Sequence, residues 1–509
     1  MTGKREELIN ELVRIVAEHA EGGPKPHVWQ VVNAGGPHRF GWFPHSPHGY
    51  IAGLDTDVLR NLERELRAPG DSRRLTMQVT LDADGNGTFD HTFDLWTISP
   101  PQVVLDPDYT YPNRPFPGMP RPEAATPTDA PTDPVALREI QALVDEFAAQ
   151  YDRVKGRPPE FGRAVTEEEL RTTEAALGAR LPEDVRALYR LVGADHRELG
   201  LLGRYSLLDL DDVVDQYEYD TRGVGDYDRD GVFTENRTAC ETGPAGHVRR
   251  LFRDDWWVEI GRDGAGLALV ADLDPGPEGR SGQLLVAGRG VEGTVEYVAE
   301  SVTALLRSVV EAVRADRVNR EHPSPGHLGA VLAPANQWYQ PSHLVGDRAL
   351  TDVLAELPAA DVQQLYLIEA TDLDLTALSA TPRLRELYVN RAGRVTVWLP
   401  PGLESLSLQA TEADLTLLKD HRALWDLTVR GVRVRATDLP ASLVRLDLSE
   451  AEVDDIDALA DLDLRVLILN WAQWAQLTRV PKRLAAAQSN GDSTLAEVAT
   501  WTARLRGAE

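Results

Sequence analysis

The 509-residue sequence has a single cysteine, Cys240, which excludes an internal disulfide and a cysteine-rich zinc site. No run approaches the ~20 apolar residues that a membrane helix needs, and residues 1–21 carry charge throughout instead of a signal-peptide core. Basic residues are scarce, since 53 Lys and Arg face 81 Asp and Glu, giving a net charge of −28. Nucleic-acid binders need a basic face, so this balance argues against nucleic-acid partners. We expect a cytoplasmic protein without a membrane segment.

The composition that remains is ordinary for globular protein. Hydrophobic residues make up 42% of the sequence and charged residues 26%, which is enough to build cores. At roughly 150 residues per domain, the length predicts about three domains. The acidic excess favours attraction to basic proteins.

The C-terminal third repeats the pattern L-x-x-L-x-L. The motif starts at positions 362, 384, 403, 424, 443 and 464. A period near 20 residues is typical of leucine-rich repeats, which must stack into a solenoid because one repeat cannot bury its apolar face. The usual Asn or Cys ladder position holds Ala370, Ala392, Thr411, Val432, Ala451 and Ala472. We expect this solenoid over residues 321–509, with a capping helix framed by Thr494 and Glu497.

Residues 166–193 have the pattern of two short amphipathic helices joined by a corner. Thr166 and Glu169 have the spacing of a capping box, which satisfies free N–H groups at a helix start. Gly178 ends the first helix, and Pro182 can begin the second without losing a needed N–H. The second helix places its apolar residues on one stripe and ends at Gly193.

This stretch and four later segments resemble the SUKH superfamily, named partly for the Smi/Knr cell-wall regulators of yeast. The later segments, in the family's order, are LLGRYSLLDLDDVV (201–214), WWVEIGRDGAGLALVADLDP (256–275), GQLL (282–285) and YVAESVTALL (297–306). The sequence departs from the family at Glu259, where Pro is usual, and in a long loop over residues 217–250. The resemblance implies an α+β SUKH domain, placed at residues 135–320. In bacteria it implies an immunity protein that binds and blocks a co-encoded toxin.

Residues 1–111 have the pattern of a small α+β domain. Apolar residues at helical spacing predict helices near Leu12 and over residues 58–66, and residues 75–81 are predicted to pair with 89–95 as strands. This order, with DADGNGTFDHTFD near its end, resembles the YezG-like antitoxin family. That resemblance implies a second immunity-type domain.

The stretch from Tyr111 to Pro134 contains eight prolines in 24 residues. They disfavour helix and central strand and favour a stiff extended form, so residues 112–134 are predicted to be a linker. The fold class predicted for the chain is α/β multidomain: an α+β N-terminal domain, an α+β SUKH domain and a leucine-rich-repeat α/β solenoid.

Two aspartate-rich stretches, residues 82–87 and 226–231, have the spacing of the first half of an EF-hand calcium loop. Their twelfth positions hold Phe93 and Arg237 instead of the bidentate Glu. A hairpin turn is therefore favoured for the first stretch and a solvated loop for the second, with metal binding as the open alternative.

No catalytic set is visible in the sequence. Residues 288–293 match G-x-G-x-x-G, but no strand follows at the spacing of a dinucleotide fold, so a loop is favoured. Cys240 has no nearby His, and His45 and His48 flank a turn without further ligands. We expect no metal, no cofactor and no enzymatic activity.

One candidate partner surface is the acidic stretch between residues 209 and 230. Its nine carboxylates are Asp209, Asp211, Asp212, Asp215, Glu218, Asp220, Asp226, Asp228 and Asp230. A solvated loop would explain them equally well. As a surface, they would steer a basic toxin and pair with its Arg and Lys side chains.

The second candidate is the concave face of the predicted solenoid, formed by the variable strand positions. Its candidate partner-binding residues are Tyr366, Arg385, Tyr388, Glu404, Trp425 and Asp447, beside Glu386, Asp426, Arg430 and Arg445. Aromatic anchors amid mixed charges are typical of protein-binding hot spots. A merely solvated face is the alternative.

These observations predict an immunity protein of a bacterial toxin–immunity system. It would neutralise a cognate, basic protein toxin, such as a nuclease, by non-covalent binding. The alternative is an intracellular scaffold or regulator that recruits cellular proteins through the leucine-rich repeats. The identity of the partners discriminates between the two.

Overall fold

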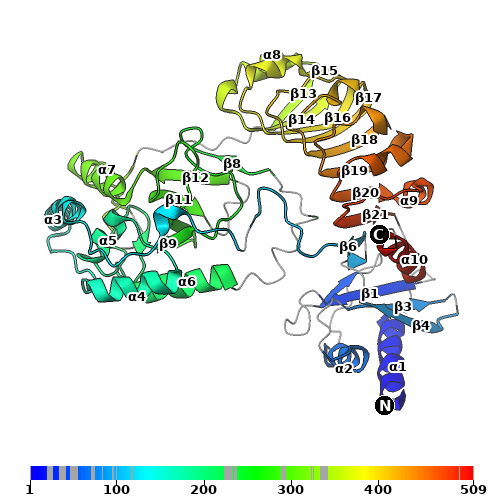
Figure 1. The fold of residues 1–509 in the computed structure, drawn as a ribbon, viewed down its shortest axis with the longest axis horizontal. Coiled ribbons are helices and arrows are strands. Elements are labelled where there is room, and N and C mark those ends of the chain that lie inside the picture. The colour runs from blue at the N-terminus through cyan, green and yellow to red at the C-terminus, as the bar shows by residue number, and fades with distance from the viewer. Residues whose placement is uncertain are drawn as a thin grey trace. The chain divides into compact units, whose positions relative to one another are not determined.

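The structure is a computed structural model. It describes residues 2–19, 27–33, 42–45, 56–69, 75–82, 84–93, 97–98, 100–115, 118–222, 233, 238–287, 294–321, 324, 326–332, 342–491 and 493–507. The chain divides into two compact units, labelled by element in Figure 1. Unit 1 comprises Met1–Tyr109 and Gln340–Glu509, and unit 2 comprises Thr110–Tyr339. The prediction of a mixed α/β protein with several sheets is confirmed.

The N-terminal part of unit 1 is an antiparallel sheet with two helices. Its elements are α1 (Thr2–His19), β1 (His27–Asn33), β2 (Trp42–His45), α2 (Thr56–Leu66), β3 (Thr76–Leu81) and β4 (Gly87–Thr92). The strand order is β2-β1-β3-β4. Leu12 and Val16 of α1 are buried in one cluster with Leu59 and Leu62 of α2. Their helical spacing is what gives each helix an apolar face.

The hairpin predicted for the first aspartate-rich stretch is present between β3 and β4. Leu81 pairs with Gly87. Asp82 Oδ1 accepts hydrogen bonds from the backbone N–H groups of Asp84 at 2.9 Å and Asn86 at 2.8 Å. The carboxylate of Asp82 therefore stabilises a turn by bonding the backbone that follows it.

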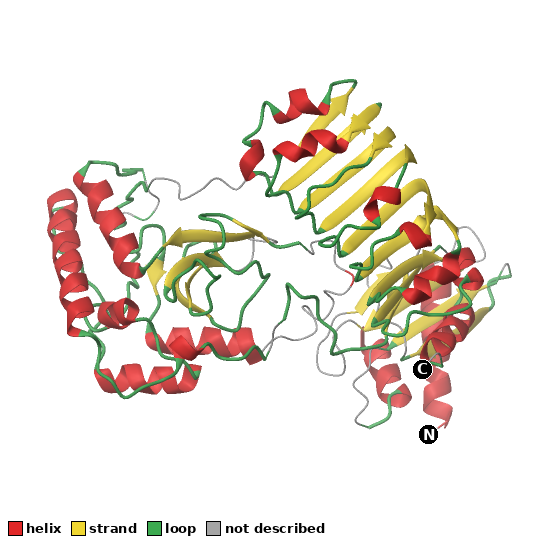
Figure 2. Cartoon of the chain, turned by 45° about the horizontal axis from the view of Figure 1, so that its top comes forward, coloured by secondary structure: helices red, strands yellow, loops and turns green. Residues whose placement is uncertain are grey.

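The rest of unit 1 is a long sheet whose strands from β13 to β21 run parallel, as Figure 2 shows. These strands are β13 (Ser342–Gly346), β14 (Gln364–Ala370), β15 (Asp372–Asp374), β16 (Glu386–Thr396), β17 (Ser405–Ala413), β18 (Asp426–Arg435), β19 (Arg445–Asp454), β20 (Val466–Asn470) and β21 (Ala486–Asn490). The connecting segments contain α8 (Leu350–Leu354), η4 (Ala359–Asp361), η5 (Leu375–Ala380), η6 (Thr416–Leu418), η7 (Ala436–Asp438), η8 (Ile456–Asp461) and α9 (Trp471–Gln476). One long-sheet strand therefore falls on each L-x-x-L-x-L motif.

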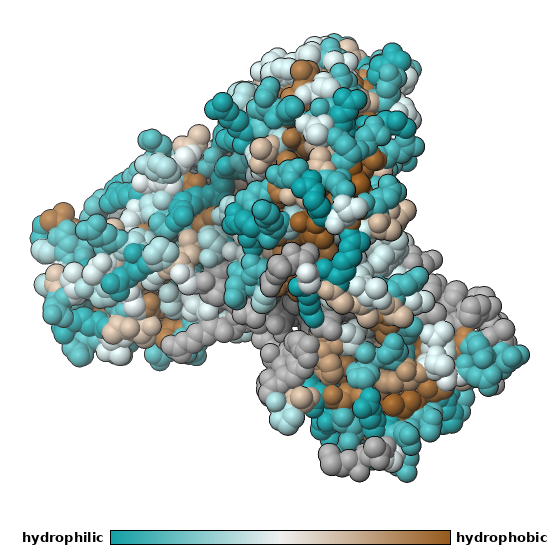
Figure 3. Space-filling view, turned by 45° about the vertical axis from the view of Figure 1, so that its right-hand side comes forward, coloured by the Kyte–Doolittle hydropathy of each residue, from teal (hydrophilic) through white to brown (hydrophobic). Residues whose placement is uncertain are grey.

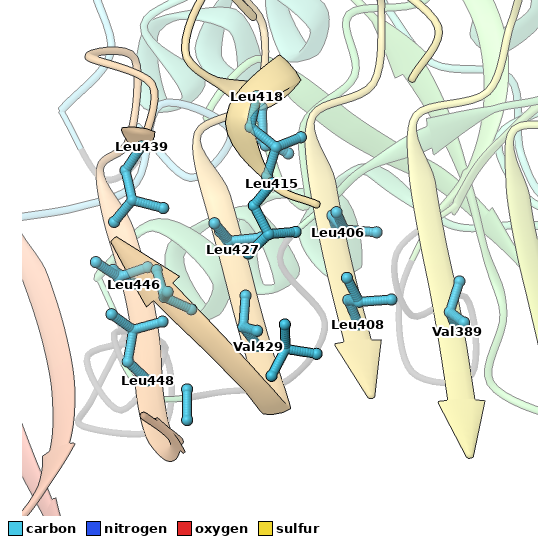
Figure 4. Close-up of a cluster of buried hydrophobic side chains, with 14 of the residues drawn as sticks. Val389, Leu406, Leu408, Leu415, Leu418, Leu427, Val429, Leu439, Leu446 and Leu448 are labelled. Atoms are coloured by element: carbon cyan, nitrogen blue, oxygen red, sulfur yellow. The ribbon is translucent and has the colours of Figure 1, made fainter. Parts of the chain in front are cut away.

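The leucines of the motifs form the core behind this sheet. Leu406, Leu427 and Leu446 lie in register on neighbouring strands and are at most 1% exposed. Figure 4 shows them on the same side of the sheet as Leu415 and Leu439 from the connecting segments. Each fully buried leucine stabilises the folded state by roughly 1.5–3 kcal/mol. Every strand of the repeat therefore adds to the stability of the sheet.

Small apolar residues, not Asn or Cys, fill the bend that follows the strands. Ala370, Ala392 and Val432, which stand at the position where Asn or Cys is usual, are buried there. An extra residue in β16 between Val389 and Ala392 shifts the register, so Ala392 pairs with Ala410 of β17, while Thr411, which the spacing predicts, is exposed. Counting along the sequence cannot locate such a bulge.

The last strand, β21, is covered by a segment from the other end of the sequence. β6 (Pro101–Val104) pairs antiparallel with β21, and β5 (Thr97–Ile98) continues the edge. Val103 is fully buried in the core of the long sheet. The predicted capping helix is α10 (Leu495–Arg506), and its Thr494–Glu497 capping box is present. β6 occupies the edge of β21 that another strand could otherwise pair with, and α10 adds Leu495, Val498 and Trp501 to the core of the long sheet.

We expect Val103→Ala to lower the free energy of unfolding of the long sheet by about 2 kcal/mol, because two buried methyl groups are lost and a cavity remains. Hydrogen exchange of β21 amides would accelerate by more than tenfold. Val135→Ala is the control, since Val135 is 57% exposed in unit 2. Equal exchange in both variants would show that β6 does not stabilise the edge.

Unit 2 is a six-stranded sheet that shares a core with its helices. Its strands, in the order β7-β9-β10-β11-β12-β8, are β7 (Ser206–Leu207), β8 (Cys240–Glu241), β9 (Trp257–Arg262), β10 (Ala268–Asp272), β11 (Gln283–Ala287) and β12 (Thr294–Ala299). Its helices are η2 (Glu123–Ala125), α3 (Pro134–Lys155), α4 (Glu167–Leu177), α5 (Glu183–Tyr189), α6 (Leu210–Arg222) and α7 (Val302–Arg314). Leu188, Val258 and Leu306 are fully buried in the shared core.

Residues 110–115 and 118–134 belong to unit 2 and do not form the free spacer that their composition suggests. Met119 and Ala125 belong to the unit 2 core. The carboxylate of Asp255 accepts hydrogen bonds from the backbone N–H groups of Gly118 at 2.6 Å and Met119 at 2.7 Å. An extended chain makes no hydrogen bonds within itself, so the N–H groups of its non-proline residues need other partners. Here the buried carboxylate of Asp255 accepts from two of them.

Candidate protein-binding surfaces

The side of the long sheet opposite the leucine core carries two rows of mostly polar side chains. Successive side chains of a strand point to opposite faces of the sheet, so these residues lie on the face away from the leucines. The strand register aligns them across five strands. The first row is Gln364, Glu386, Ser405, Asp426 and Arg445; the second is Tyr366, Tyr388, Ser407, Thr428 and Asp447. We call these ten side chains the polar face.

Hydrogen bonds join Gln364 to Glu386 and join Ser405 and Arg445 to Asp426 within the first row. Gln364 Nε2 donates to Glu386 Oε2 at 2.5 Å. Arg445 Nη1 donates to Asp426 Oδ1 at 2.8 Å, and Ser405 Oγ donates to the other oxygen of that carboxylate at 3.1 Å. These charge-assisted bonds fix the row, because buried polar groups must be paired.

Two tyrosines stack at one end of the second row. The rings of Tyr366 and Tyr388 lie 4.3 Å apart between centroids and 5° from parallel. Tyr388 Oη donates to Glu386 Oε1 at 2.8 Å. Burial, reinforced by the carboxylate of Glu386, raises the pKa of Tyr388, so its hydroxyl keeps its proton and remains a donor.

The predicted solenoid residues divide into two groups. Tyr366, Tyr388 and Asp447 belong to the polar face, whereas Arg385, Glu404 and Trp425 stand one position before their strands. Backbone hydrogen bonds join those three residues: Glu404 N donates to Arg385 O at 2.8 Å, and Trp425 N donates to Glu404 O at 3.0 Å. Arg385 Nη1 lies 3.9 Å from Glu404 Oε1. They form an adjoining row.

Sequence analysis missed Gln364, Ser405, Ser407 and Thr428 as members of the polar face. The repeat alone could have found them, because each occupies the same motif position as a predicted residue on a neighbouring strand. Gln364 is 7% exposed and Ser405 is 5% exposed. The repeat does not predict this burial.

The acidic stretch begins on α6 of unit 2. Asp209 precedes the helix, and its Oδ1 accepts a hydrogen bond from Asp212 N at 2.9 Å. Asp211, Asp212 and Asp215 are exposed, and Glu218 is half-buried. The helix thus presents carboxylates on one side. Of the other predicted members, the side chain of Asp220 and all of Asp226, Asp228 and Asp230 lie outside the described residues.

A second group of carboxylates in unit 2 is buried and was not predicted. Asp272 Oδ2 accepts a hydrogen bond from Gln283 Nε2 at 2.8 Å. Burial, with a contribution from Asp254, raises the pKa of Asp272 to about 7. Burial raises the pKa of Asp254 to about 6, with Arg249 opposing. Burial therefore makes the charged form of both carboxyl groups less favourable than it is in water.

No group of three or more His, Cys, Asp or Glu residues suited to hold a metal ion occurs in the described parts of the chain. Across those same parts, none of the helices combines the length and apolarity that a bilayer crossing requires. Cys240 is buried at the start of β8. His48 and the glycine-rich residues 288–293 lie outside the described residues.

Comparison with known proteins identifies one segment. Residues 164–308, which run from just before α4 into α7, match the SMI1 / KNR4 family (SUKH-1). Over 135 residues the chain is 30% identical to the cell wall biosynthesis/cell cycle regulator smi1 of Schizosaccharomyces pombe, covering 25% of this chain and 27% of that protein. Over 187 residues it is 22% identical to a glucan synthesis regulatory protein of Neurospora crassa, covering 31% and 35%. The chain thus spans about a quarter to a third of these relatives, and its residues 164–308 are similar to the SMI1/KNR4 (SUKH-1) family.

Proposed function

We propose that this chain is a non-catalytic regulatory scaffold that binds protein partners through the polar face of its long sheet. The observation that carries the proposal is the polar face itself, where a stacked tyrosine pair lies beside ordered charges. Aromatic anchors among charges are what protein-binding hot spots use. The two fungal relatives, named as regulators of cell-wall and glucan synthesis, support a regulatory role.

The same proposal includes the nature of the two parts of unit 1. We take the long sheet to be a leucine-rich-repeat solenoid, supported by one strand per motif and by the leucine core behind it. We take the N-terminal part to be a YezG-like domain, on the resemblance of its element order. A cytoplasmic location fits these modules.

A second candidate is neutralisation of a basic toxin, the function that the SUKH resemblance implies for bacteria. The exposed carboxylates of α6 support it, because they would attract a basic protein and pair with its Lys and Arg side chains. Such inhibition needs no chemistry from the inhibitor.

Affinity capture from the cells that express the full-length chain tests both candidates. The scaffold predicts several cellular partners whose capture survives charge reversal at Asp211 and Asp215. Neutralisation predicts one stoichiometric partner with a toxin domain, lost on that reversal and kept when exposed Asp152 and Glu311 are reversed. If no protein is enriched over a tag-only control, the binding function is wrong.

A further inference from the structure

One segment of unit 2 lies on its surface and buries few of its own side chains. We call this segment, residues 118–133, the strap; Figure 1 shows it as part of the irregular cyan trace that leads to α3. Its buried side chains are Met119, Ala125 and Thr132, which are 9%, 1% and 6% exposed. The other side chains of the strap are exposed or half-buried. Apolar burial therefore accounts for only part of its attachment.

The carbonyl groups of the strap are bound by Arg180, at the corner between α4 and α5. The backbone N–H of Arg180 donates to Ala125 O at 2.8 Å. Its Nη1 donates to Thr128 O at 3.1 Å and to Ala130 O at 3.0 Å. Glu183 Oε1 accepts from Arg180 Nη2 at 2.6 Å and so holds the guanidinium in place. Arg180 binds these carbonyl groups whatever side chains the strap carries.

The amide groups of the strap are bound by carboxylates. Asp255 accepts from the first two residues of the strap, as described above. At the other end, Asp133 N donates to Glu183 Oε2 at 2.8 Å, and Thr132 N donates to Glu167 Oε1 at 3.3 Å. Main-chain groups are the same in every peptide, so these contacts select a conformation more than a sequence. We call Glu167, Arg180, Glu183 and Asp255 the strap site.

Proline gives the strap the conformation that the strap site binds. Pro122 (φ −60°, ψ 142°) and Thr126 (φ −65°, ψ 125°) have angles close to those of polyproline II on either side of η2. The short turn between them places Ala125 in the core. Proline-rich segments are pre-organised in this way and lose little conformational entropy on binding, which makes them common ligands of peptide-binding domains.

Two further contacts determine which segments fit. Arg121 Nη1 donates to the carbonyl oxygen of Gly178 at 2.9 Å. Gly178 ends α4, and the C-terminal end of a helix attracts a positive charge. Ala125 is almost completely buried, so a large side chain has no room at its position. A ligand for the strap site therefore needs an arginine and, four residues later, a small residue.

We propose that the strap site also binds a proline-rich segment of a partner protein, with the strap as the internal competitor of that segment. The partner segment has an arginine four residues before an alanine or another small residue, as the strap has. The strap site lies within residues 164–308, the part of the chain that matches a family, whereas the strap lies outside that part. The family-like part thus provides the site, and a segment from outside it fills the site.

The surface of the molecule suits a partner of this kind. Figure 3 shows mainly hydrophilic residues over the visible surface, with hydrophobic residues in small patches. A segment held by main-chain hydrogen bonds and one small apolar anchor needs no large apolar contact. This binding site belongs to unit 2 and does not depend on the polar face of unit 1.

The test uses the full-length chain and a labelled peptide with the sequence of residues 118–133, followed by fluorescence anisotropy. In the wild type the tethered strap competes at an effective concentration on the order of millimolar, so the peptide should bind weakly. Ala125→Glu in the chain weakens the strap and leaves the strap site unchanged. The peptide should bind this variant at least about tenfold more tightly than it binds the wild type. Ala124→Glu is the matched control, because it adds the same charge at the exposed neighbouring residue and should behave as the wild type.

A second substitution shows whether the peptide occupies the strap site. Combined with Ala125→Glu, Arg180→Ala should weaken peptide binding at least about tenfold, because the hydrogen bonds of the guanidinium to two carbonyl groups are lost. Arg320→Ala in the same background is its control, since Arg320 pairs with Asp316 and both side chains are exposed. Equal binding by these two double variants would place the peptide elsewhere and overturn the proposal.

Hydrogen exchange of the wild type gives a measurement that does not depend on any variant folding. If the strap can leave its site while unit 2 stays folded, the amides of Gly118 and Asp133 should exchange at least about tenfold faster than those of β10. Equal rates, or no peptide binding to Ala125→Glu and to the milder Arg121→Glu, would show that the strap is a permanent part of the fold and would refute the proposal. Dimerisation of the wild type that Ala125→Glu abolishes would identify a second copy of the chain as the occupant and refute it as well.

Discussion

Replacing Arg186 by alanine is expected to lower the free energy of unfolding of unit 2 by about 3–5 kcal/mol. The side chain of Arg186 is fully buried. Its Nη1 donates to Glu174 Oε2 at 2.5 Å and its Nη2 to Glu167 Oε2 at 2.9 Å. The variant would leave the carboxylate of Glu174, itself 2% exposed, buried without its cation. Urea-dependent hydrogen exchange of peptides from α4 and α5 would measure the loss.

Arg171→Ala is the control for this experiment. Arg171 pairs with Glu168 at 2.9 Å, but both side chains are exposed, so the loss should stay below about 1 kcal/mol. The double variant Arg186→Met with Glu174→Leu is expected to recover most of the stability, because apolar residues of similar volume can replace a buried pair. A loss in Arg186→Ala no larger than in Arg171→Ala would contradict a stabilising role for the buried pair.

The helices around Arg186 show which features sequence alone can predict. The Thr166–Glu169 capping box and the helix end at Gly178 are present where the spacing predicts them, because both are local signals. The second predicted helix ends earlier, at Tyr189, and not at Gly193. The ion pair with Glu174, twelve residues away, depends on the angle between two helices, which no periodicity encodes.

The candidate surfaces show the same limit. The period of the repeats predicts that Tyr366 and Tyr388 share a row, and the register confirms it. It does not predict that Glu386 beside them is almost completely buried, because burial depends on how the neighbouring side chains pack. Residues 110–134 are a further case, since composition reports the local preference for an extended chain but not the hydrogen bonds that Asp255 offers.

The buried carboxylates of unit 2 give the second large effect, a loss of stability as pH rises. The pKa of Asp254 is raised to about 6 and that of Asp272 to about 7, both above the value of 3.8 in the unfolded chain. Protons therefore bind the folded state more tightly, so this contribution is fully present below about pH 4 and lost as pH rises through 6 and 7. We expect the wild type to lose on the order of 2–3 kcal/mol between pH 5.5 and pH 8 from these two groups.

Asp254→Asn should remove part of this dependence without breaking the hydrogen bonds of the site. Asp254 Oδ1 accepts a hydrogen bond from Trp256 N at 2.9 Å, which an amide oxygen can keep. Its Oδ2 has no hydrogen-bond partner among the described residues and lies 4.0 Å from Arg249 Nη1, so an amide nitrogen there displaces no hydrogen bond. The variant also removes the charge that raises the pKa of Asp272. At pH 8 it should be more stable than wild type by on the order of 3 kcal/mol, with a shallower dependence on pH.

Hydrogen exchange of β10 peptides, compared between variant and wild type at each pH, measures this difference while cancelling the intrinsic effect of pH on exchange. The series runs from pH 5.5 to pH 8, because the chain has an isoelectric point near 4.9 and loses the repulsion that keeps it in solution there. Asp152→Asn, at an exposed position of α3, should follow the wild type. A variant that gains nothing at pH 8, or that keeps the full wild-type slope, would show that the carboxylate of Asp254 carries no cost in the fold. A gain that grows with pH would instead identify the charge itself as the cost, since the shape of the side chain is unchanged.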